Sequence, residues 1–105
     1  MHSDLTDSTL RLLFDGDILS TEIATLRPLL LGYLDSSTGV SALVADLSAS
    51  KIVDSQGLNL LMALLHETER RKWTFRVENA DPDLRRLFTV LNLNSRFGIG
   101  AVDPK

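Results

Sequence analysis

The chain has 105 residues, no cysteine and a formal net charge of −3. This length accommodates one small domain, the lack of cysteine excludes disulfides and thiolate metal sites, and the acidic balance argues against a nucleic-acid partner. No apolar run is long enough to cross a bilayer and Met1–Thr9 does not resemble a signal peptide, so we expect a cytoplasmic protein with no direct membrane insertion.

The first half of the chain predicts a strand, a helix and a second strand. After a polar N-terminal lead-in, residues 1–9, the apolar run Leu10–Phe14 predicts a buried strand that ends in a turn at Asp15–Asp17. A helix is expected over Thr21–Leu34, capped by Ser20 or Thr21. Pro28 lies inside it, where we expect a kink or a helix that restarts. The mostly apolar segment Val40–Leu47 predicts a central strand.

The second half continues the alternation. We expect a long helix over Gln56–Lys72, a half-exposed strand over Trp73–Glu78, a helix over Pro82–Leu91 capped by Asp81, and a last short strand near Phe97–Val102. We expect residues 103–105 to form a tail. The pattern predicts a single α/β domain over residues 10–102. Functional loops of such folds follow the strands, here at Asp15–Thr21, Ser48–Gly57 and Asn79–Pro82.

Residues suited to catalysis are not brought together by any pattern in the chain. His66 is the one histidine away from the terminus, and about 16 Å of helix separates it from Ser55. No glycine-rich phosphate loop is present, and nothing in the sequence brings Asp15, Asp17 and Asp54 around a metal ion. We therefore expect no enzymatic activity, no cofactor and no metal site.

Two features of the long helix allow alternative interpretations. Asp54 and Ser55 precede it, so that either residue can serve as its N-cap, and Ser55 can also be a site of modification. Leu60 and Leu64 add a second apolar row to the helix. This row is either buried against the sheet and the neighbouring helix, or exposed where a partner docks.

Three segments together resemble a known family. "VADLSASKIVDSQGLNLLMAL", residues 44–64, resembles the signature of the STAS domain of bacterial anti-sigma factor antagonists, in which a strand ending in D-L-S precedes an apolar pair and D-[ST]-x-G-L. "FDGDILSTEIATL", residues 14–26, resembles the turn and first helix of that family. "VENADPDLRRLFTVLNLNSRF", residues 77–97, resembles its later segment.

The resemblance implies a STAS fold, which is a small, mostly parallel sheet of four or five strands faced by three or more helices. It also implies that Ser55 accepts a phosphate from an anti-sigma serine/threonine kinase, that the unphosphorylated protein binds this kinase, and that a phosphatase resets the switch. We expect a monomer or weak dimer. The implied partner-binding residues are Asp17, Leu19, Ser20, Thr21, Asp54, Ser55, Gln56, Gly57, Asn59 and Leu60.

STAS domains also occur in other assemblies, which leaves an alternative function. In this alternative the protein is an adaptor or subunit of a transport complex of the lipid or ABC type, or of a chemotaxis-linked complex, and Ser55 is only structural. A hydrolase that uses Ser55 as nucleophile is disfavoured, because neither a base nor an oxyanion arrangement is recognisable.

Overall fold

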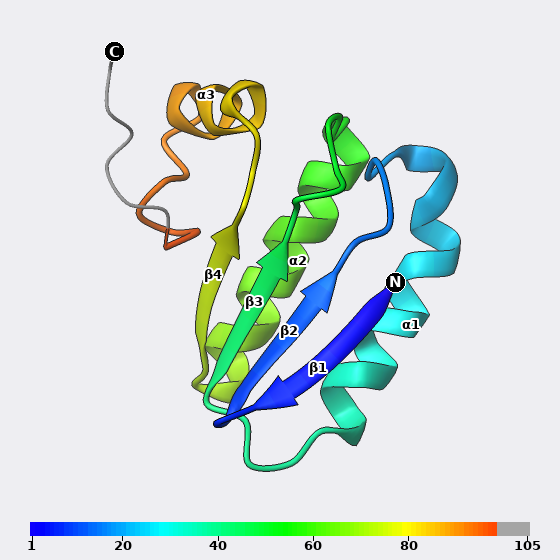
Figure 1. The fold of residues 1–105 in the computed structure, drawn as a ribbon, viewed down its shortest axis with the longest axis vertical. Helices are drawn as coiled ribbons and strands as arrows, with labels where there is room; N and C mark the ends of the chain where they lie inside the picture. The colour runs from blue at the N-terminus through cyan, green and yellow to red at the C-terminus, as the bar shows by residue number, and fades with distance from the viewer. Residues whose placement is uncertain (99–105) are drawn as a thin grey trace.

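The structure, a computed structural model, describes residues 1–98 (Figure 1). Four strands form one sheet in the order β1-β2-β3-β4: β1 (His2–Thr6), β2 (Thr9–Leu13), β3 (Ala42–Asp46) and β4 (Thr74–Glu78). Strand β1 is antiparallel to β2, whereas β2, β3 and β4 are parallel to one another. The sheet is therefore mixed and mostly parallel, as the strand–helix alternation predicts.

Helices cover only one face of this sheet. Helix α1 (Ile23–Ser36) lies beside and behind β1, and α2 (Ser55–Arg71) lies behind β3 and β4, while α3 (Pro82–Val90) lies beyond the carboxyl end of β4 (Figure 1). The loops that precede α1, α2 and α3 all lie at this same end of the sheet. The predicted α/β class and the gathering of the three loops are both confirmed.

The core lies between the sheet and the helices α1 and α2. The register aligns Leu10 with Leu43 and Phe75, and Leu12 with Ala45 and Val77. These side chains are all buried, because alternate residues of a strand point to the same face. The helical side of the core is supplied by the buried residues Leu30, Leu34, Leu60, Leu61, Leu64 and Leu65.

The segment after α3 returns to β4 and covers its edge. Phe97 is fully buried, and its ring packs edge-to-face against those of Phe75 and Phe88 at centroid distances of 5.8 and 5.1 Å. The carbonyl of Phe97 accepts a hydrogen bond from the Val77 amide at 2.7 Å. Of the last strand expected at Phe97–Val102, Phe97 and Gly98 lie in a turn, and residues 99–102 lie outside the described residues.

Strand β1 is an element that the sequence pattern does not reveal. It occupies most of the segment interpreted as a polar lead-in, and all five of its residues are exposed. The turn that joins it to β2 places Asp7 and Ser8 at positive φ, the geometry of a tight hairpin. Because β1 buries no side chain and depends on pairing with β2, it lacks the apolar alternation by which strands are recognised.

The start of α1 differs from the expected cap. A 3₁₀ turn, Ser20–Glu22, precedes the helix, and neither Ser20 nor Thr21 caps it with a side chain. The helix also does not restart at Pro28, which lies inside a continuous helical segment. Both Pro28 and Ala24, whose carbonyl loses its usual amide partner, are exposed, so water can satisfy that carbonyl.

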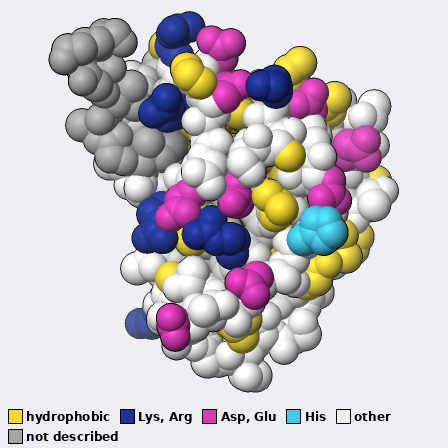
Figure 2. Space-filling model, in the orientation of Figure 1, with side chains coloured by type: hydrophobic (Ala, Val, Ile, Leu, Met, Phe, Trp, Pro, Cys, Tyr) yellow, Lys and Arg dark blue, Asp and Glu magenta, His cyan; other side chains and the backbone are white. Residues whose placement is uncertain are grey.

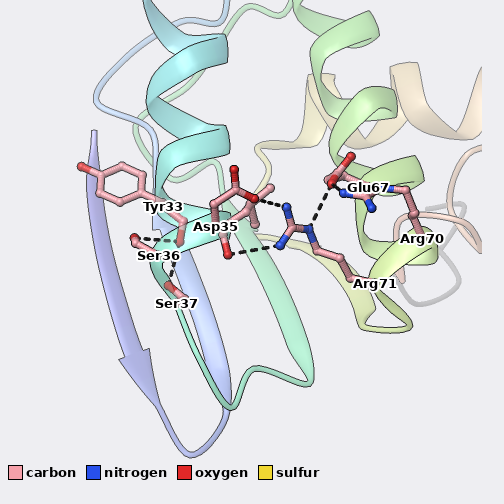
Figure 3. A network of polar contacts seen from close by, with 8 residues as sticks. Tyr33, Asp35, Ser36, Ser37, Glu67, Arg70 and Arg71 are labelled. Carbon is pink, nitrogen blue, oxygen red and sulfur yellow. Dashed lines mark hydrogen bonds and ion pairs between the residues drawn. The ribbon is translucent and has the colours of Figure 1, made fainter.

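A polar network joins the carboxyl ends of α1 and α2, far from the three loops (Figure 3). The Arg71 guanidinium pairs with Asp35 of α1 and, at 3.0 Å, with Glu67 of α2. It also lies 5.3 Å from the centre of the Trp73 ring. The ion pair links α2 to α1 at this end, and the stacking places Arg71 against the residue that precedes β4.

Candidate functional site

The loop between β2 and α1 and the loop between β3 and α2 form one continuous surface. Ile18 and Val53 make a parallel β-bridge. In this bridge the Ile18 amide donates to the Ile52 carbonyl at 2.9 Å, and the Asp54 amide donates to the Ile18 carbonyl at 3.2 Å. The bridge extends the pairing of β2 with β3 into the loops and fixes the position at which α2 begins.

Asp17 holds the β3–α2 loop from the side of the β2–α1 loop. Its Oδ1 atom accepts hydrogen bonds from the Lys51 and Ile52 amides at 2.8 and 3.0 Å. These two N–H groups, Lys51 first, lower the pKa of Asp17 below its ordinary value. The contact assigns Asp17, predicted as a partner-binding residue, a role in joining the loops.

Asp54 joins the same two loops from the opposite direction. One carboxylate oxygen accepts from the Gly57 amide at 2.8 Å and caps α2, and the other accepts from the Ser20 amide at 2.7 Å. The Gly57 and Ser20 N–H groups, in that order, lower the pKa of Asp54. The structure therefore decides between the two possible caps: Asp54 is the N-cap of α2, and Ser55 is its first helical residue.

Gly57 is required by the packing of the two loops. A Cβ atom added to it would lie 2.0 Å from the carbonyl oxygen of Ile18 and 2.9 Å from the Ile18 carbonyl carbon. Gly57, implied by the family resemblance as a partner-binding residue, is buried and does not face a partner. Its small size serves the approach of the β2–α1 loop to α2 within this chain.

The remaining predicted residues divide into exposed and buried ones. Ser55, Gln56 and Asn59 are exposed on the first turns of α2, Ser20 and Thr21 are exposed beside them, and Leu19 is half-buried. Within residues 1–98 the Ser55 hydroxyl forms no hydrogen bond.

Leu60 and Leu64 are not part of this surface. They are 2% and 3% exposed and belong to the core, so docking of a partner on this apolar row is contradicted and its burial is confirmed. One exposed residue was missed: Ile52 is 57% exposed while Val53 is buried. The apolar pair alone does not indicate which of the two residues faces solvent.

A second polar cluster lies on the open face of the sheet, near the carboxyl ends of the strands. Asp46 is 8% exposed, and its oxygens accept from the Ser48 amide at 3.0 Å and from Arg11 and Asn79 at 3.2 Å. Arg11 also donates to Glu78 at 2.8 Å. Figure 2, which views this face, shows cationic and anionic side chains interleaved across the sheet. The cluster ties β2, β3 and β4 together below the loops.

Two opposing influences act on the Asp46 carboxyl. Burial by itself raises the pKa of Asp46, but the Ser48 amide, the Asn79 side chain and the Arg11 charge together lower it below its ordinary value. A carboxyl with a depressed folded-state pKa stabilises the fold above its unfolded-state pKa of about 4, and this contribution is lost as the pH falls through the folded-state pKa.

Replacing Asp46 by asparagine should therefore lower the free energy of unfolding by about 1 to 3 kcal/mol at neutral pH. Asparagine keeps an oxygen for the Ser48 amide but sets an NH₂ donor against the donors of Arg11 and Asn79. Denaturant unfolding at about pH 7 and about pH 3 should show the difference from wild type shrinking in acid. A difference of equal size at both pH values would contradict this role.

The described residues, 1–98, contain neither a metal-binding cluster nor a membrane-spanning helix. Within residues 1–98, no group of three or more histidine and acidic residues is arranged to hold a metal ion. Asp15 pairs with the Met1 amino group and His2, whereas Asp17 and Asp54 bind backbone amides. His66 is exposed. None of the helices in these residues has the length and apolarity to cross a membrane.

Comparisons with known proteins agree with this architecture. A crystal structure of a sulfate transporter family protein from Wolinella succinogenes superposes with a TM-score of 0.72 over 90% of this chain and 75% of its own, at 12% identity. That likeness concerns the fold. No curated protein matched the sequence significantly. The family model described as "Mlab, STAS domain" matches residues 1–100, nearly the whole chain. The chain belongs to the STAS domain family.

Proposed function

We propose that this protein is a non-enzymatic anti-sigma factor antagonist. It binds an anti-sigma serine/threonine kinase through the exposed residues around the start of α2, here called the switch surface, and phosphorylation of Ser55 releases it. A phosphatase restores the binding form. The switch surface consists of Leu19, Ser20, Thr21, Ile52, Ser55, Gln56 and Asn59, which are exposed or half-buried.

The main support for the proposal is that Asp54, and not Ser55, caps helix α2. Asp54 makes the capping bond to Gly57, whereas the exposed Ser55 hydroxyl has no hydrogen-bond partner within residues 1–98. A serine needed only to cap the helix would occupy the position of Asp54. The hydroxyl is therefore available to a kinase without any unfolding of the loop.

The position of Ser55 also makes a phosphate compatible with the fold. As the first residue of α2 it lies at the positive end of the helix dipole, where unpaired N–H groups favour an anion. A phosphate adds about −1.5 to −2 charges at pH 7. The change is confined to the surface, so it can repel a partner while the core beneath stays intact.

The first experiment is phosphotransfer. Incubation of the full chain with the anti-sigma kinase and ATP should place a single phosphate on Ser55, as mapped by mass spectrometry, and Ser55→Ala should accept none. Two neighbouring hydroxyls, Ser48 and Thr21, are exposed and serve as internal controls. Ser50 is buried and donates to the Gly16 carbonyl at 2.6 Å, so it should stay unmodified. Phosphate on Ser48 or Thr21 instead of Ser55 would contradict the assignment of the acceptor.

A second candidate function has one observation in its favour. The similar solved structure comes from a sulfate transporter family protein, so this fold also occurs among proteins of transporter families. In that case the chain is an adaptor or subunit of a transport or chemotaxis-linked complex, and Ser55 is never modified. The two functions differ in one result: a transport subunit should bind its partner equally well with Ser55 or with glutamate at that position.

A further inference from the structure

A groove lies beside the switch surface, and Ser55 is not among the residues that line it. It lies between the β2–α1 loop and the first turns of α1 and has a volume of about 440 Å³. Its apolar wall is formed by Leu19, Leu26 and Leu29. Leu19 and Leu26 are half-buried, and Leu29 is 40% exposed. Exposed leucines that line a groove are typical of a surface that another chain covers.

The charged groups around this groove are mostly negative. Its acidic lining residues are Asp15, Asp17 and Glu22; Met1, with its cationic amino group, also lines it, and no lysine or arginine does. Asp15 is already paired with the Met1 amino group and with His2. Asp17 uses only one of its two oxygens for the Lys51 and Ile52 amides, and the exposed Glu22 makes no ion pair within residues 1–98. The complementary occupant carries cationic groups beside apolar ones.

The groove is continuous with the switch surface. Leu19 belongs to both, and the next residue, Ser20, donates its amide to the Asp54 carboxylate at the start of α2. A partner that covers Leu19 at the switch surface therefore also covers one wall of the groove. We infer that the groove anchors a cationic, amphipathic segment of the partner kinase, separately from the contact at Ser55; the identity of that partner rests on the proposed function.

Two separate contacts explain how phosphate releases a partner from an acidic surface. Phosphotransfer requires the Ser55 hydroxyl to face the terminal phosphate of ATP, so the kinase presents negative charge there. After the transfer, the negative charge of the phosphate on Ser55 repels the phosphates of the ADP that remains on the kinase. The cationic segment in the groove carries the opposite charge and is not repelled. The groove supplies affinity and the Ser55 contact supplies the switch.

The chemistry of the groove is tested first without the kinase. The isotope-labelled full chain is titrated with an amphipathic lysine–leucine peptide and, as a control, a glutamate–leucine peptide of the same length. The cationic peptide should shift the NMR amide signals of Leu19, Glu22 and Leu29, and the acidic peptide should not. Shifts that are absent, or that fall elsewhere on the surface, overturn the inference.

The use of the groove by the kinase is tested with a matched pair of leucines. Leu29 lines this groove and Leu31, on the same helix, lines a different one with Leu60 and Leu64. They are 40% and 41% exposed, so substitution by glutamine perturbs the fold similarly. Leu29→Gln should weaken kinase binding about tenfold, and Leu31→Gln should leave it unchanged.

A second matched pair tests the charge. Glu22→Lys should weaken kinase binding about tenfold at low salt and less at high salt, whereas Glu69→Lys, an equal charge change on an exposed residue of α2, should not. If all four variants bind the kinase like wild type, the groove inference is wrong and the Ser55 switch stands. If wild type does not bind the kinase, the proposed function fails, and the peptide titration alone decides the chemistry of the groove.

Discussion

Replacing Gly57 by alanine should destabilise the protein by at least about 1 to 3 kcal/mol, the usual cost of overpacking. The new methyl carbon would lie 2.0 Å from the Ile18 carbonyl oxygen, and the backbone cannot move aside as a flexible side chain could. Retreat of Ile18 would also break its hydrogen bonds with Ile52 and Asp54. Thermal and denaturant unfolding monitored by circular dichroism should show the loss directly.

Gly32→Ala is the matched control for this change. Gly32 also lies in a helix, but a Cβ added to it meets nothing within 4 Å. Because alanine favours helix over glycine by up to about 1 kcal/mol, this variant should be as stable as wild type or slightly more so. Equal stability of the Gly57→Ala and Gly32→Ala proteins would show that the close contact with Ile18 does not constrain α2.

Replacing Ser55 by glutamate should weaken kinase binding at least about tenfold, because a fixed negative charge then faces the nucleotide phosphates. The effect should be smaller than that of phosphate, which carries more charge and more acceptor oxygens. Ser55→Gln has nearly the same size without the charge and should bind much more like wild type. Since Asp54 rather than Ser55 caps α2, both variants should melt within a few degrees of wild type.

Two binding results would contradict the expectation that charge at position 55 releases the kinase. If Ser55→Glu and Ser55→Gln weaken binding equally, the size of the side chain and not its charge disturbs the contact. If Ser55→Glu binds as tightly as wild type while remaining folded, phosphorylation has no electrostatic means of releasing the partner, and the function as a transport or chemotaxis-linked subunit becomes the better account.

Local patterns predicted those parts of the fold that depend on neighbouring residues. The cap at Asp81 is a side chain that bonds to the amide three positions along, so sequence spacing alone reveals it. For α2 the same spacing limited the cap to Asp54 or Ser55, and the structure identifies Asp54. The alternation of strands and helices likewise predicted that three loops meet at one end of the sheet. The exposure of Ser55 follows from its place directly after the cap.

Local sequence patterns could not predict the contacts between segments that are distant in the sequence. Asp17 binds amides at Lys51 and Ile52, and Asp54 binds the Ser20 amide, across separations of about 34 residues. Both carboxylates could therefore be read as surface residues. The packing role of Gly57 is hidden from the sequence for the same reason, because the atom that excludes a side chain there belongs to Ile18 in another loop.

Sequence patterns also do not show whether an apolar row on a helix is buried or exposed. Leu60 and Leu64 extend the apolar face of α2, and their packing with core residues of other elements determines that they are covered. The sequence also does not show that β1 is a strand. Its five exposed residues have no alternation of apolar and polar side chains, and they form a strand by pairing with β2. In each case the deciding partner lies on a different element.

The most direct test of the switch compares the phosphorylated and unphosphorylated proteins themselves. The chain carrying one phosphate on Ser55 is separated from the unmodified chain, and each is titrated into the ADP-bound anti-sigma kinase by isothermal calorimetry. Phosphate on Ser55 should raise the dissociation constant at least about tenfold and more than Ser55→Glu does, while the melting temperature changes by only a few degrees. Equal dissociation constants for the two forms would show that phosphorylation of Ser55 does not release the kinase.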